Sequence, residues 1–153
     1  MLPRLIADLI WPALFLEQRL FSFWPIVLGL VVEFFFVRHL TNLSLWRCLL
    51  ADVTMNAVSA LLGAVFIPLA GIAWEIFPGL ILSQVFHLGT FNPGTWAATF
   101  LFSVLVSAVL ESLVLYYGFK QQPFRRIFWW MCAANSCSVG LAFVSLFAYP
   151  SQH

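Results

Sequence analysis

Two stretches of the chain, RCLLADVTMNAVS at residues 47–59 and RIFWWMCAANSCS at residues 126–138, carry the same polar pattern in apolar surroundings. Each stretch starts with arginine, reaches an Asn-x-x-Ser motif at the same spacing, and is preceded by a glutamate. The members of the two copies are Glu33, Arg47, Asn56 and Ser59, and Glu111, Arg126, Asn135 and Ser138. This agreement predicts two tandem copies of one helical hairpin.

The composition is typical of a membrane protein. Hydrophobic residues make up 63% of it and charged residues 8%, with a mean hydropathy of +0.98, whereas soluble domains carry about 25% charged residues. A bilayer core about 30 Å thick accommodates such a chain as helices of about 20 residues. We therefore expect an integral membrane protein, and the net charge of +1 offers no basic face for nucleic acid.

Four apolar stretches are long enough to cross a bilayer. Because backbone groups in lipid must be satisfied internally, all four are expected to be helices. They are residues 20–37, 48–70, 95–119 and 127–148. The expected fold is all-α, with tandem hairpins at 20–70 and 95–148. An even number of helices in each copy implies a pseudo-twofold axis along the membrane normal.

The remaining segments complete a single membrane domain over residues 1–153. Residues 1–18 place apolar side chains at helical spacing against Arg4 and Asp8, which predicts an amphipathic helix lying in the membrane interface. Residues 71–94 form an outer connection broken at Pro78-Gly79 and at residues 92–94. That connection is expected to fold back over the outer surface, and a re-entrant half-helix is the alternative.

The distribution of basic residues predicts the orientation. The links 38–47 and 120–126 hold five of the seven Lys and Arg residues, and the other two are Arg4 and Arg19. Positive charge accumulates on the cytoplasmic side. Both links are therefore expected in the cytoplasm, with the N- and C-termini on the opposite side.

Polar residues within the apolar stretches are expected to form one layer. Counted from the nearest link at helical rise, the Glu and Asn positions lie about 8–14 Å into the membrane. The expected intramembrane cluster consists of Glu33, Asp52, Asn56, Ser59, Glu111, Asn135 and Ser138. Met131 occupies the position that corresponds to Asp52, so the two halves are not chemically equivalent.

This layer has a structural and a functional interpretation. In the first, Glu33 bonds Asn56, Glu111 bonds Asn135, and the serines bond their own helices, which would fix helix register. In the second, the three carboxyl groups form a proton or cation relay, because ionisable groups inside a membrane are candidates for function.

Other residues indicate contact with lipid and no further chemistry. Arg47 and Arg126 open two helices beside Trp46 and Trp129, an arrangement typical of interfacial anchors. The spacing of the cysteines and histidines predicts neither a disulfide nor a metal site. No motif for nucleophilic catalysis or for a cofactor is present in the sequence, so no cofactor is expected.

Two functions remain open at this stage. The first expectation is a small, non-catalytic accessory or assembly subunit of a larger membrane complex, which binds lipid and the transmembrane helices of partner subunits or of its own copies. The alternative is a small oligomeric proton or cation channel or transporter that uses Glu33, Asp52 and Glu111. Because four helices enclose little space, oligomerisation is expected to form its path.

Overall fold

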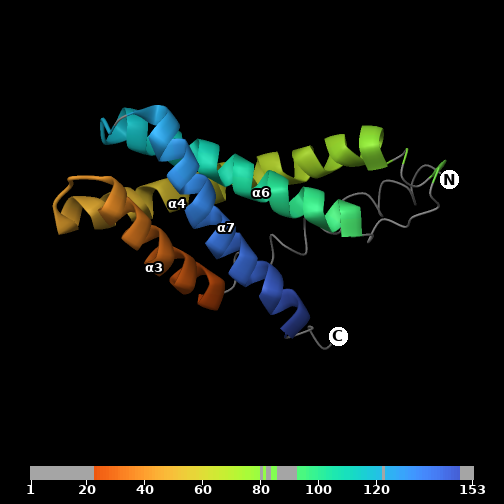
Figure 1. Ribbon diagram of the computed structural model, residues 1–153, viewed down its shortest axis with the longest axis horizontal. Coiled ribbons are helices and arrows are strands. Elements are labelled where there is room, and N and C mark those ends of the chain that lie inside the picture. The colour runs from red at the N-terminus through yellow and green to blue at the C-terminus, as the bar shows by residue number, and fades with distance from the viewer. Residues whose placement is uncertain (1–22, 80, 82–83, 86–92, 122, 149–153) are drawn as a thin grey trace.

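The computed structural model describes residues 23–148 except for 80, 82–83, 86–92 and 122. The interfacial helix expected at residues 1–18 lies outside these residues. Four helices carry the described part of the chain (Figure 1). They are α3 (Phe23–Leu40), α4 (Leu45–Trp74), α6 (Pro93–Leu113) and α7 (Phe124–Ala148), with π-helical turns η1 (Glu75–Gly79) and η2 (Val114–Gly118) extending α4 and α6.

The four helices coincide with the four apolar stretches of the sequence. Two of them, Leu45–Gly79 and Pro93–Gly118, are long and apolar enough to cross a membrane by length and composition. Each carries its own backbone hydrogen bonds along its whole length, as a chain surrounded by lipid requires.

Helix α4 is longer than the sequence suggests. It continues through residues 71–74, and η1 then extends it to Gly79, although residues 71–94 were expected to form a connection. Pro68 lies inside the helix without ending it, because a proline removes one hydrogen bond and the adjoining turns can hold the segment. The described part of this helical segment reaches Gly79, so Pro78 also lies within a helical turn.

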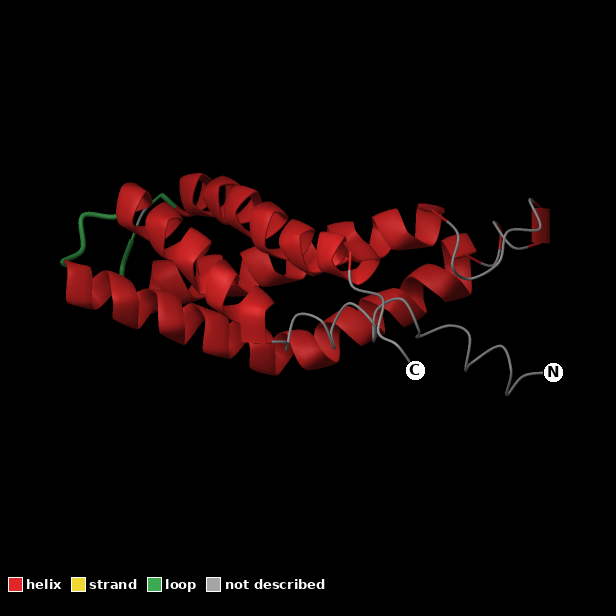
Figure 2. Cartoon of the chain, turned by 90° about the horizontal axis from the view of Figure 1, so that it is seen from below, coloured by secondary structure: helices red, strands yellow, loops and turns green. Residues whose placement is uncertain are grey.

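The helices pack as a ring in which each contacts two neighbours. The order around the ring is α3, α4, α6, α7 and back to α3, and α3 and α4 pack least closely. The two described links, drawn green in Figure 2, lie at the same end of the bundle. From that end, α4 runs beside α6 and α3 runs beside α7, and the two pairs diverge in Figure 1.

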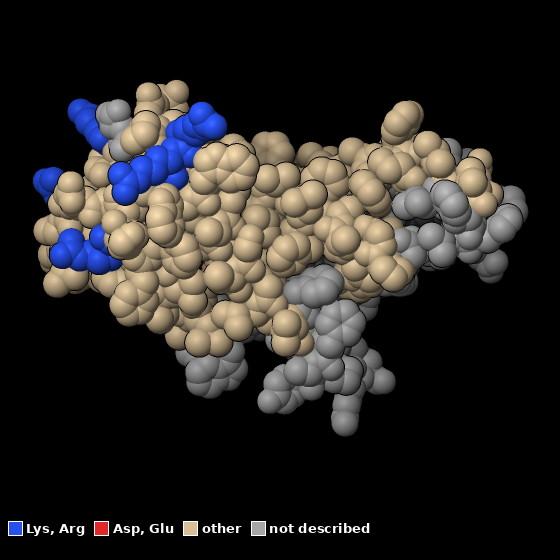
Figure 3. Space-filling model, in the orientation of Figure 1, with Lys and Arg blue, Asp and Glu red and all other residues tan. Residues whose placement is uncertain are grey.

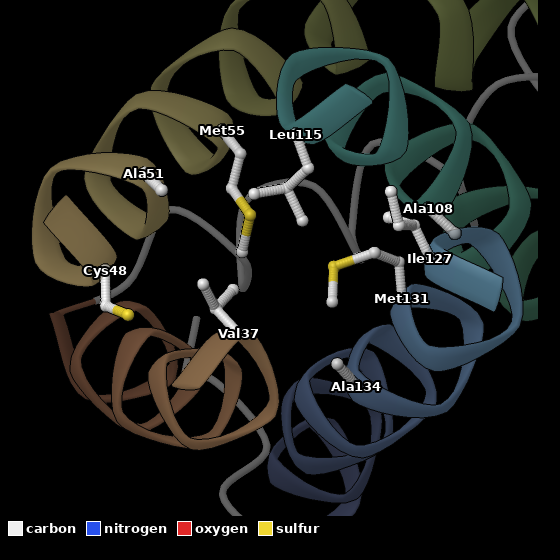
Figure 4. Close-up of a cluster of buried hydrophobic side chains, with 9 residues drawn as sticks. All are labelled: Val37, Cys48, Ala51, Met55, Ala108, Leu115, Ile127, Met131 and Ala134. Carbon is white, nitrogen blue, oxygen red and sulfur yellow. The ribbon is translucent and has the colours of Figure 1, made fainter. Parts of the chain in front are cut away.

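Apolar side chains fill the bundle at the end that holds the links. This plug comprises Val37, Cys48, Ala51, Met55, Ala108, Leu115, Ile127, Met131 and Ala134, all almost fully buried (Figure 4). The members on α7 recur at spacings of four and three residues, so one helix face supplies them. The same end carries the basic residues, which gather at one extremity of the face shown in Figure 3.

Candidate functional site

Asparagine and glutamate pair within each hairpin. The Asn56 amide nitrogen on α4 donates to Glu33 Oε2 on α3 over 2.6 Å. The Asn135 amide nitrogen on α7 donates to Glu111 Oε2 on α6 over 2.5 Å. Both pairings expected from the sequence are therefore confirmed.

Each of these amide groups is also held by its own helix. Asn56 Nδ2 donates to the Asp52 carbonyl oxygen and Asn135 Nδ2 to the Met131 carbonyl oxygen, both over 3.0 Å. An amide nitrogen has two hydrogens, so one can serve the helix and the other the carboxyl group. The second bond fixes the orientation of each asparagine toward its glutamate.

The two serines connect one hairpin to the other. Ser138 Oγ on α7 donates to Glu33 Oε1 on α3 over 2.7 Å. Ser59 on α4 and Glu111 on α6 line the same cavity, and Ser59 lies close enough to act on the Glu111 carboxyl group. Each glutamate thus bonds an asparagine from its own hairpin and has a serine of the other hairpin nearby, and in Glu33 that serine is hydrogen-bonded.

The serines also bond their own helices, as the sequence predicts. Ser59 Oγ lies 3.2 Å from the Asn56 carbonyl oxygen, and Ser138 Oγ lies 3.2 Å from that of Ala134. A hydroxyl group has one hydrogen, so Ser138 donates either to Ala134 or to Glu33. When Ser138 donates to Ala134, its oxygen can accept a hydrogen bond from a neutral Glu33. The geometry therefore suits both protonation states of this carboxyl group.

The acidic side chains are almost completely removed from solvent. Glu33 is 2% exposed, Glu111 1% and Asp52 1%. Asp52 Oδ1 lies 3.4 Å from Asn56 Nδ2, which places a third carboxyl group beside the first pair. Charge buried in this way is costly unless a proton or an opposite charge neutralises it.

The described basic residues lie away from this layer. All five are exposed and belong to the two links or to the helix ends next to them. They are Arg38, Arg47, Lys120, Arg125 and Arg126. Since none of them lines the cavity described next, its carboxyl groups receive no compensating charge from the described side chains that line it.

A cavity of about 320 Å³ adjoins the glutamates inside a single chain. Six of the seven predicted cluster residues line it, and Asp52 does not. Ser107, Gly63 and Gly29 also line it. Gly29 is not among the site residues predicted from the sequence. The sequence contains one signal for it, because a glycine one helical turn before Glu33 leaves space beside that carboxyl group.

The cavity lies on the side of the polar layer that faces away from the links. Besides the polar residues, its lining on α3 and α4 extends to Ile26 and Ile67, whereas the plug occupies the opposite side. All of the residues that line this cavity belong to one chain.

The predicted anchors all lie on the surface at the link end. Trp46 is 78% exposed and Trp129 62%, and the arginines beside them, Arg47 and Arg126, are exposed as well. Such aromatic and basic pairs are typical of a membrane interface.

Within the described residues, no three His, Cys, Asp or Glu side chains come close enough together to hold a metal ion. No protein-family model, no curated protein and no solved structure matches the chain.

Proposed function

We propose that this chain is a multi-pass membrane protein that binds a proton or a small cation at Glu33 and Glu111 and carries it through the helix bundle. The observation that carries this proposal is the cavity, which is lined by two buried carboxyl groups and by no described basic side chain. Neutralisation of such groups has to come from a proton or from a cation that enters the cavity.

In this proposal all four described helices cross the membrane. The apolar character of α4 and α6 supports it, as do large apolar side chains exposed around the bundle. The links lie in the cytoplasm and the termini on the opposite side, because the described Lys and Arg residues gather at the link end. The cavity then lies on the side of the polar layer that faces away from the cytoplasm.

The two hairpins are related by a pseudo-twofold axis along the membrane normal. This relation is supported by the serine contacts between the hairpins. Ser138 of the second hairpin bonds Glu33 of the first, and Ser59 of the first lies near Glu111 of the second. A symmetric pair of acids lets a proton or cation pass between equivalent positions. Asp52 breaks the equivalence on one side.

Transport requires the plug to open. Leu115 and Met131 lie on the link side of Glu111 and Asn135, Met55 packs in the same cluster, and all three are completely buried. Because α3 packs less closely with α4 than with α7, we expect the motion to occur mainly between α3 and α4. Rigid-body motions of this kind give alternating access in membrane carriers.

A second candidate is an accessory subunit of a membrane complex. The observation that favours it is a stripe on α4 formed by Leu61, Val65 and Leu69, which are 77%, 55% and 53% exposed and follow one another at four-residue spacing. In a membrane, this stripe faces lipid or a helix of another subunit. Stoichiometric foreign subunits after extraction in mild detergent would support this candidate.

Ion flux into proteoliposomes tests the main proposal. Purified protein is reconstituted alone, and proton, Na⁺ and K⁺ uptake are measured under an imposed membrane potential. Glu33→Gln combined with Glu111→Gln is expected to lower the flux by about tenfold or more, because neutral amides hold neither a proton nor a cation. Ser136→Ala is the matched control, since Ser136 is exposed and bonds its own helix at Cys132.

The outcomes separate the two candidates. Uptake that depends on both glutamates supports the carrier. Uptake that the double variant leaves unchanged, or no uptake of any of these ions, overturns it.

A further inference from the structure

The cavity has one polar end and mostly apolar walls. Glu33 and Glu111 lie at the polar end with their asparagine and serine partners. The walls come mainly from α3 and α4 and include Leu30, Ala57, Ala60, Ala64 and Ile67. A ligand that matches both parts needs a positive group and an apolar body.

The cavity opens sideways between α3 and α4. Its lining residues Val53, Ala57, Ala60 and Ala64 on α4 are exposed, as is Ile26 on α3. This is also where neighbouring helices of the ring pack least closely. If the bundle is embedded in a bilayer, the opening faces acyl chains, so a molecule can enter from the membrane.

The glutamates retain capacity for further hydrogen bonds. Glu33 accepts one bond at each oxygen, from Asn56 and from Ser138, whereas a carboxylate has about four acceptor sites. An ammonium group offers three donors and one positive charge, so it can use the remaining sites and neutralise the charge.

The size of the cavity and its chemistry favour an organic cation over a metal ion. Ca²⁺ and Mg²⁺ prefer sites with several carboxylate ligands, and among the described residues no three His, Cys, Asp or Glu side chains come together to hold a metal ion. A volume of about 320 Å³ lies within the range of pockets for small organic molecules. Most of it would stay unfilled around a bare ion.

We propose that the cavity binds a primary alkylammonium ion, which enters from the membrane between α3 and α4 and places its ammonium group at Glu33 and Glu111. This inference rests on the proposed function and names a second class of cation that the same two carboxyl groups bind, besides the proton or small cation that is carried. Lateral entry explains why small residues line the α4 side of the opening, since Ala57, Ala60 and Ala64 leave room for an alkyl chain.

Binding to protein in nanodiscs of neutral lipid tests this inference. The probe is radiolabelled octylammonium, and the saturable component is the part that excess unlabelled octylammonium displaces. Octanol and octanoate, which have the same chain length without the positive charge, are expected to displace about tenfold less at equal concentration. The Glu33→Gln and Glu111→Gln double variant is expected to lose affinity by about tenfold or more.

Two glycine variants distinguish obstruction of the cavity from a non-specific loss of binding caused by a larger side chain. A Cβ atom added at Gly63 meets only the Ile67 Cδ1 atom, at 3.5 Å, and Gly63 lines the cavity, so Gly63→Leu is expected to place its side chain in the cavity. Gly140→Leu is the control, because nothing lies within 4 Å of the added Cβ atom and Gly140 does not line the cavity. We expect about tenfold weaker binding for Gly63→Leu and a change within about twofold for the control.

Each result has one meaning. Saturable octylammonium binding that Gly63→Leu and the glutamate double variant both weaken supports the inference. Absence of saturable binding, equal displacement by octanol, or equal binding by the Gly63→Leu variant overturns it. Glutamate-dependent flux of protons or Na⁺ in proteoliposomes would then still support the proposed carrier, so failure of the ligand class is distinct from failure of the carrier.

Discussion

The Ser138 hydroxyl group on α7 donates a hydrogen bond of 2.7 Å to Glu33 on α3, although 105 residues separate them. This bond joins the first and last described helices and helps to close the ring of four. A second contact, between Ser59 and Glu111, joins α4 to α6. The polar layer therefore holds the two hairpins together and also positions both carboxyl groups beside the cavity.

Loss of the Ser138 hydroxyl group should weaken the contact between α3 and α7. Ser138→Ala removes a buried donor to Glu33, and hydrogen bonds between helices in membranes contribute about 0.6 kcal/mol on average and up to about 1.7 kcal/mol. We expect a loss of about 1 kcal/mol in the free energy of unfolding, measured by denaturation in mixed micelles. Ser136→Ala should change it little, because Ser136 is exposed. Equal effects of the two variants would contradict a linking role for Ser138.

The two asparagines should differ in their contribution to stability. Both line the cavity, but Asn135 is 3% exposed, whereas Asn56 is only partly buried. Substitution by alanine leaves a carboxyl group without its amide donor, which costs about 1–3 kcal/mol when no water replaces the bond. Asn135→Ala should therefore destabilise the protein more than Asn56→Ala, because water can more readily replace the amide at the less buried position. Thermal unfolding in detergent would show which variant is less stable. A lower unfolding temperature for Asn56→Ala would indicate that water reaches Glu33 less readily than Glu111.

The sequence predicts the pairs within a hairpin better than the contacts between hairpins. Glu33 and Asn56 lie at matching depths on consecutive helices, so a short link brings them together. The bond from Ser138 to Glu33 depends on which helices become neighbours when the ring closes, and helical periodicity in one segment does not contain that information. Periodicity predicts only the bond between Ser138 and its own helix, which the structure also contains.

The cavity and the full length of α4 also depend on tertiary structure. The cavity exists because α3 and α4 separate beyond the polar layer, and no local pattern fixes the angle between two apolar helices. A continuous apolar run shows where a helix is possible but gives a weak signal for its end. Helix α4 therefore passes residue 70 and continues through η1 to Gly79.

Replacement of Lys120 by glycine should stabilise the second link. Lys120 has a φ of 52°, a left-handed conformation that costs a residue with a side chain about 1 kcal/mol relative to glycine. Lys120→Gly should raise the free energy of unfolding by up to about 1 kcal/mol. Lys120→Ala removes the same charge but keeps the strained conformation, so it should give no such gain. A gain with alanine would assign the effect to the charge.

The proposed orientation places both links on one side of the membrane. Asn42 in the first link is exposed, and Gln121 lies in the second. In a chain whose native cysteines are replaced by serine, Asn42→Cys and Gln121→Cys should both react with a membrane-impermeant maleimide only after the cytoplasmic side is opened. Labelling of the two positions from opposite sides would exclude two antiparallel hairpins with the same orientation.

Truncation of the plug should make the bundle leak as well as destabilise it. Leu115 is completely buried, and it packs with Met55 between the polar layer and the links (Figure 4). Leu115→Ala should lower the free energy of unfolding by about 2–5 kcal/mol, because it removes apolar contacts and leaves a void. In the proposed carrier, that void lies between the cavity and the link end, so passive proton flux should rise.

Leu61→Ala is the control, since Leu61 is 77% exposed on α4 and should change neither quantity. A Leu115→Ala variant that is less stable but not leakier than the wild type would show that the plug supports the fold without acting as the barrier. The barrier to ions would then have to lie in the polar layer itself, where the serine hydroxyl groups join the two hairpins.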